Sequence, residues 1–110
     1  MKVSELEGAE LDYWVAKALG WTPDPDMSPE SYTEGYWHGT SDFYAKYEWK
    51  PSTNWNQGGP LIEKFYICLD YDFCGTWIAA IPEKPNKYGP TPLIAAMRAL
   101  VASKFGEEVE

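Results

Sequence analysis

The sequence has only two cysteines, one histidine and no long apolar run, and each shortage excludes a class of protein. Cys68 and Cys74 cannot supply the several bridges of a small secreted domain, and a zinc site needs four ligands at recognisable spacing. No stretch of about 18 apolar residues predicts a membrane span, and the first residues form no signal segment. We therefore expect a reducing, cytoplasmic setting with two buried or half-buried thiols.

Basic residues are also few, because nine Lys and Arg stand against seventeen Asp and Glu for a net charge of −8. A surface that binds nucleic acid needs Lys and Arg to displace counterions from phosphates, so direct binding to nucleic acid is disfavoured. Acidic residues gather near both ends, in residues 5–12 and 107–110. We interpret them as a solvated surface and a frayed tail rather than as a surface for a basic partner.

Aromatic side chains, in contrast, make up 16% of the 110 residues, a length that predicts a single domain over residues 1–110. The clearest element is a helix over residues 91–106. Thr91 is a suitable N-cap, Pro92 suits the first helical position, and Gly106 suits the left-handed residue after the end. Nearly every position between them is apolar, which predicts a helix buried on most of its circumference.

A second helix is predicted over residues 4–20. Ser4 and Glu7 have the spacing of a capping box, and Gly20 suits the residue that follows the helix end. Residues 22–35 are rich in Pro, Asp and Ser and are predicted to form a long loop.

Four segments have the alternation or the aromatic content of strands: residues 36–38, 43–49, 65–71 and 77–81. The last two flank a turn and are predicted to pair as a hairpin. Residues 39–42 are predicted as a turn, and residues 85–90 as the loop into the last helix. We therefore expect an α+β fold, with three helices packed on a small, mainly antiparallel sheet as an α/β/α layered sandwich.

The third helix is the hardest to place. Ser52 or Thr53 is a suitable cap for a helix that begins near Asn54, but a Gly-Gly-Pro string weakens its middle. Proline lacks the backbone N–H and disfavours helical geometry in the residue before it. Local physics therefore predicts a short first turn, a kink at Pro60 and a second segment.

Three segments together resemble the NinX-like family of small phage proteins: residues 11–21, 51–63 and 89–99. They are also similar to the wider phage α/β/α-sandwich domain family, in which a helix, a turn and second helix, a hairpin and an Ala-rich helix follow in order. The string Gln57-Gly58-Gly59-Pro60 is the most specific part of the match. The resemblance implies a phage or prophage origin and the cytoplasm of an infected cell. It also implies one continuous helix over residues 54–65, and it supplies no catalytic residues.

Catalytic chemistry is not indicated by the residues themselves. His38 is accompanied by no nucleophile elbow and no cysteine signature, so we interpret it as a surface or aromatic-cluster histidine. Asp70 and Asp72 are interpreted as turn formers rather than as an acid–base or metal pair with Asp42. We expect no metal and no cofactor.

The best candidate for a site is an aromatic surface with neighbouring amides. Period-two alternation places some aromatic residues opposite the core, and exposed Trp and Tyr mark interfaces. Amide groups beside Trp55 are able to fix a polar ligand. The candidate ligand- or partner-binding residues are Trp37, His38, Trp49, Ser52, Thr53, Asn54, Trp55, Gln57, Gly58 and Gly59. We interpret the two glycines first as close packing, and second as room for a ligand to approach the backbone.

Together with the family resemblance, these observations predict a small non-enzymatic phage or prophage accessory protein. We expect it to bind a host or phage protein through an aromatic and acidic surface in the host cytoplasm. No membrane partner is expected, and self-association through exposed aromatics is a further prediction. The alternative is a small-molecule binder, for a metabolite or nucleotide signal, with an aromatic and amide groove around residues 49–59.

Overall fold

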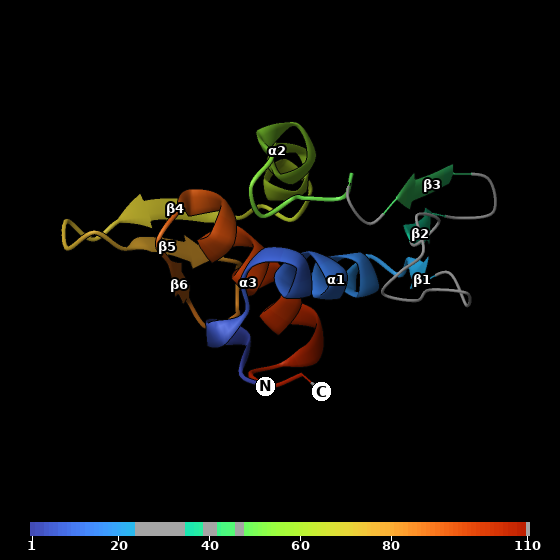
Figure 1. Ribbon diagram of the computed structural model, residues 1–110. Helices are drawn as coiled ribbons and strands as arrows, with labels where there is room; N and C mark the ends of the chain where they lie inside the picture. The colour runs from blue at the N-terminus through green and yellow to red at the C-terminus, as the bar shows by residue number, and fades with distance from the viewer. Residues whose placement is uncertain (24–34, 39–41, 46–47, 110) are drawn as a thin grey trace.

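Helix α3 (Pro92–Phe105) runs through the middle of the protein in the computed structural model, and it contacts α1, α2 and two strands of a sheet (Figure 1). The structure describes residues 1–23, 35–38, 42–45 and 48–109, of which 22–23, 35–38 and 42–45 are described by their backbone. The hydroxyl of Thr91 accepts the N–H of Ile94 at 3.1 Å, and Gly106 follows the helix with φ +85°. The predicted caps and the burial of this helix on most of its circumference are confirmed.

The sheet on one side of α3 contains β4 (Cys68–Tyr71), β5 (Trp77–Ala80) and β6 (Lys87–Gly89), paired antiparallel in that order. The predicted hairpin is confirmed as β4 and β5. The prediction of a loop over residues 85–90 is wrong for β6, which pairs with β5 and lies against α3. Gly89 explains this approach, because a Cβ there would lie 2.7 Å from the backbone nitrogen of Ala95.

The first helical region is divided into a short 3₁₀ helix, η1 (Val3–Glu5), and α1 (Gly8–Ala18). The predicted capping box is wrong, because Glu7 is extended and no side chain caps α1. A distant residue fixes this break: Arg98 donates from Nε to the carbonyl of Leu6 at 2.8 Å. The predicted helix end is confirmed, since Gly20 has φ +81° and the N–H of the residue after it bonds back to Ala16.

Helix α2 (Trp55–Lys64) is one continuous helix, as the family resemblance implies, and the predicted kink at Pro60 is wrong. Asn54 provides the cap in place of Ser52 or Thr53, because its Oδ1 accepts the N–H of Asn56 at 2.9 Å. Pro60 removes only one helical donor, and its ring is exposed. A helix capped at its N-terminus tolerates that single loss.

A second antiparallel sheet contains β1 (Thr22–Pro23), β2 (Gly35–His38) and β3 (Asp42–Ala45). It lies at the end of the molecule opposite the β4–β5 turn (Figure 1). The predicted strand over residues 36–38 is confirmed, and the one over 43–49 is shorter than predicted. Most of the predicted 22–35 loop, and residues 39–41 of the predicted 39–42 turn, lie outside the described residues. The turn prediction is wrong for Asp42, which begins β3.

The α+β class is confirmed, with three α-helices and two three-stranded antiparallel sheets in the described part of the chain. The two ends of the chain lie together (Figure 1). The N–H of Val3 donates to the backbone carbonyl of Glu107 at 2.9 Å, and the backbones of Lys2 and Glu108 form an isolated antiparallel β-bridge. The expectation of a frayed tail is therefore wrong as far as Val109, which is buried. The expectation of buried or half-buried thiols is also wrong, because both cysteines are exposed and unbridged.

Candidate functional site

The segment over residues 48–53 folds against α1. Trp49 is buried, and its indole Nε1 donates to the backbone carbonyl of Asp12 at 2.9 Å. Its ring lies 4.3 Å from that of Trp21, with an angle of 48° between the ring planes. Ser52 is 1% exposed, and its N–H donates to Oδ1 of Asp12 at 2.9 Å. Asp12 therefore holds this segment with both its backbone and its side chain.

Asp12 is itself buried, which is uncommon for a carboxylate. Burial raises the pKa of its carboxyl above the ordinary 3.8, whereas the N–H and hydroxyl of Ser52 and the charge of Lys50 oppose this rise. The buried Ser52 Oγ makes no hydrogen bond of normal geometry, so we attribute its effect to the nearby hydroxyl dipole. The burial of the carboxylate dominates.

The amide of Gln57 closes the same segment from the side of α2. Its Oε1 accepts the N–H of Lys50 and its Nε2 donates to the carbonyl of Glu48, both at 2.6 Å. Gly58 lies so close to the segment that a Cβ would meet the carbonyl oxygen of Pro51 at 2.4 Å. The close-packing interpretation of Gly58 is confirmed.

Trp49, Ser52 and Gln57 thus make hydrogen bonds within the protein, and Gly58 packs against the same segment. The other candidate residues differ in how far they are exposed. Trp55 is 54% exposed, and its ring lies over Gly59. Thr53 is exposed as well. The side chains of Trp37 and His38, in β2, lie outside the described part of the structure. The accessible part of the candidate surface around residues 49–59 is centred on Trp55.

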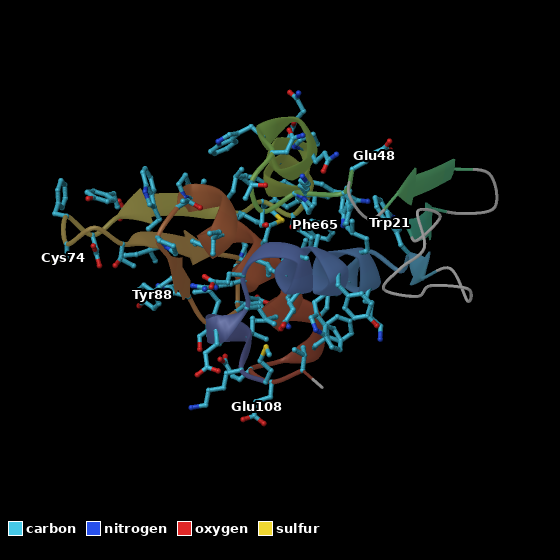
Figure 2. The ribbon with its side chains drawn as sticks, in the orientation of Figure 1. Trp21, Glu48, Phe65, Cys74, Tyr88 and Glu108 are labelled. Carbon is cyan, nitrogen blue, oxygen red and sulfur yellow. The ribbon has the colours of Figure 1, made fainter. Side chains whose placement is uncertain are left out.

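A second surface lies at the turn between β4 and β5, which extends away from the helices; Figure 2 labels Cys74 at its far end. Phe73 is 90% exposed there. The ring of Tyr71 contacts that of Phe73 at 5.7 Å and that of Trp77 at 5.1 Å, between ring centroids. We call these three residues the aromatic tip. Aromatic rings held in a row bury a large area when a partner covers them.

The backbone of the tip is held in a defined conformation. Oδ1 of Asp72 accepts the N–H groups of Cys74 at 2.8 Å and of Thr76 at 3.3 Å, and the N–H of Asp72 donates to the carbonyl of Thr76. The interpretation of Asp72 as a turn former is confirmed. Phe73 has φ +65°, a left-handed conformation that disfavours bulky residues. The turn thus presents an apolar ring where glycine or asparagine fits more easily.

At the outer edge of β4, one backbone N–H beside the tip is bonded to a side chain of the same strand. Because Asp72 bonds to Thr76 across the hairpin, alternation directs the N–H of Tyr71 to the open edge. Oδ1 of Asp70 accepts that N–H at 2.8 Å. A strand added beside Tyr71 would have to displace this carboxylate, which disfavours strand pairing at that residue.

Sequence reasoning missed the aromatic tip because it treated the turn as a connector. The sequence did contain a signal. Phe73 is a large apolar residue in a turn of Asp, Cys and Gly, outside any predicted strand. Only the structure shows its exposure and its contact with Tyr71. Trp77, the third residue of the tip, belongs to the strand predicted over residues 77–81.

Two absences concern the described residues alone. Among residues 1–23, 35–38, 42–45 and 48–109, no group of three or more His, Cys, Asp or Glu is arranged to hold a metal ion. In the same ranges, no helix has the length and hydropathy needed to cross a membrane.

Comparison with known proteins gives one match that covers nearly the whole chain. The family model described as "Bacteriophage P22, NinX" matches residues 2–104. A search of curated proteins gave no match.

Proposed function

The chain belongs to the phage NinX family, and from that premise we infer that it is a non-enzymatic accessory protein that binds another protein through the aromatic tip. The binding would take place in the cytoplasm of the infected bacterium, with a host or a phage protein as the partner. The observation that carries this proposal is the exposure of Phe73, 90%, in a turn whose backbone is fixed by hydrogen bonds.

The strain at Phe73 supports a role outside folding. A bulky residue with positive φ costs of order 1 kcal/mol, and such residues are concentrated at functional sites. The cost is not offset by burial, because the ring is almost fully exposed. The hydrogen-bonded backbone of the turn also suits binding, since little backbone freedom is lost when a partner covers the ring.

Small-molecule binding around residues 49–59 has less support. The amide of Gln57 and the Oδ1 of Asn54 make bonds within the protein, and Trp49 is buried. A ligand there would have to rely mainly on Trp55. We keep Trp55 as a second contact surface for a protein partner, because an exposed Trp is a frequent anchor at interfaces.

The test is affinity capture from a lysate of phage-infected bacteria with purified parent protein and the variant Phe73→Gly. Captured proteins are identified by mass spectrometry, purified and titrated against each variant. We expect one protein that binds the parent and loses at least tenfold in affinity with Phe73→Gly, since a central aromatic anchor is worth about 2 kcal/mol or more.

The matched control is Tyr66→Gly. Tyr66 is also an exposed aromatic residue (77%) with positive φ, +55°, but it lies outside the tip. It should leave the capture unchanged. Capture of the same protein, at the same affinity, by Phe73→Gly would refute a role for the tip, and Trp55→Ala would then test the second surface.

A further inference from the structure

We propose that the partner presents an apolar pocket with basic groups at its rim, and that Asp70 and Asp72 pair with those groups while Phe73 enters the pocket. This inference rests on the proposed function and adds the chemical class of the partner. It concerns the charges around the aromatic tip, which the capture experiment with Phe73→Gly does not examine.

The surroundings of the tip carry one sign of charge. Asp70 and Asp72 alternate with Tyr71 and Phe73, so a carboxylate precedes each of the two exposed rings. Between residues 65 and 83 the sequence contains three acidic residues and no Lys or Arg. Neither carboxylate has an ion-pair partner among the described residues. Such a surface attracts a basic partner and repels an acidic one.

The hydrogen bonds that Asp70 and Asp72 make within the hairpin leave both carboxylates able to pair with basic groups of a partner. Asp70 is exposed and uses one oxygen for the N–H of Tyr71. Asp72 is half-buried and uses one oxygen for the turn. In each case the second oxygen receives no hydrogen bond from the residues that the structure describes. A Lys or Arg of the partner would reach these oxygens without disturbing the hairpin.

The same charges argue against a second copy of this chain as the occupant. Two tips in contact would bring four carboxylates together with no cation from either hairpin. The net charge of −8 adds a repulsion over longer range. Like charges placed together at an interface exclude wrong partners, so the charge pattern favours a different protein with a basic rim.

The test uses the double variant Asp70→Asn, Asp72→Asn. Each amide retains an oxygen that can accept the hydrogen bonds now made by Oδ1, so the turn keeps its acceptors while two charges are removed. The probe is the purified protein identified by capture, titrated at about 50 mM and about 500 mM salt, where screening lengths differ about threefold.

We expect the double variant to weaken binding about three- to thirtyfold at the lower salt, mainly by slowing association, and the difference to shrink at the higher salt. Loss of binding with Phe73→Gly but equal affinity for parent and double variant at both salts would overturn the basic rim and leave the proposed function standing. Binding that survives Phe73→Gly would overturn both.

Self-association is measured in the same preparation by sedimentation velocity. A dimer that forms with rising concentration and disappears with Phe73→Gly would identify a second copy as the occupant, which overturns the proposal of a basic partner. A monomer throughout supports it. If no protein is enriched by the parent over Phe73→Gly, both the partner class and protein binding through the aromatic tip are overturned.

Discussion

The carboxylate of Asp12 on α1 accepts the backbone N–H of Ser52, forty residues further along the chain, at 2.9 Å. The bond joins the first helix to the segment that precedes α2. Because Asp12 is 5% exposed and burial raises the pKa of its carboxyl, its ionisation is coupled to folding.

Replacement of Asp12 by Asn is expected to change how stability depends on pH. Burial holds the pKa of Asp12 in the folded protein above 3.8, so the folded state retains a proton that the unfolded state releases. The contribution of this group to the free energy of unfolding is therefore fully present below pH 3.8 and is lost as pH rises through the raised pKa.

Asp12→Asn removes this contribution and keeps an oxygen for the N–H of Ser52. Urea unfolding of both proteins at a series of pH values will measure it. The free energy of unfolding of the parent, minus that of the variant, should decrease as pH rises above 3.8. A difference between the two free energies of unfolding that stays constant as pH rises above 3.8 would show that the ionisation of Asp12 is not linked to folding.

Neighbouring glycines of α2 should respond in opposite ways to alanine. At Gly58 a Cβ would meet the oxygen of Pro51 at 2.4 Å and Cδ2 of Leu93 at 2.7 Å, so Gly58→Ala should lower the free energy of unfolding by about 1–3 kcal/mol. At Gly59 the nearest atom is Cε3 of Trp55, at 3.9 Å.

Gly59→Ala should leave stability unchanged or raise it by up to about 1 kcal/mol, because alanine favours a helix whereas the proline that follows works against the gain. Chemical denaturation of the two variants side by side provides the measurement. Equal effects would contradict the close approach of α2 to residues 48–53.

Tyr66 and Phe73 are both exposed aromatic residues with positive φ, but replacement by glycine should change the stability of the protein differently at each. Tyr66→Gly should stabilise the protein by about 0.5–1 kcal/mol, since relief of left-handed strain exceeds the added freedom of the unfolded chain. Phe73→Gly gains the same relief but loses the ring contact with Tyr71, worth about 0.5–1.5 kcal/mol, so its stability should stay near that of the parent. Thermal and urea unfolding will measure both, and a Phe73→Gly variant destabilised by several kcal/mol would show that the ring serves the fold.

Local signals in the sequence were sufficient for the parts of the fold that local bonds determine. Thr91, Pro92 and Gly106 define α3 from side chains within a few residues of its ends. The start of α1 was mispredicted because its determinant is Arg98, which bonds to Leu6 from 92 residues away. The kink expected at Pro60 did not form, because one missing donor is a small loss in a helix held at its ends.

In the candidate site, too, the sequence indicated local features but not those that depend on contacts between separate segments. The sequence identified residues 49–59 as unusual for their amides and glycines, but it did not show that Gln57 bonds to the backbone of Glu48 and Lys50. The sequence alone does not distinguish an amide that binds a ligand from one that bonds to the protein's own backbone. The exposure of Phe73 likewise depends on how far the hairpin extends from α3, a relation between distant elements.

The pair of Trp21 and Trp49 has an optical consequence. Indole rings 4.3 Å apart and tilted by 48° couple their electronic transitions, which gives paired bands of opposite sign in the circular dichroism spectrum. One ring follows the end of α1 and the other belongs to the segment bound to Asp12. The protein therefore carries a built-in spectroscopic reporter of whether that segment is docked, which would follow its separation from α1 during unfolding without any added label.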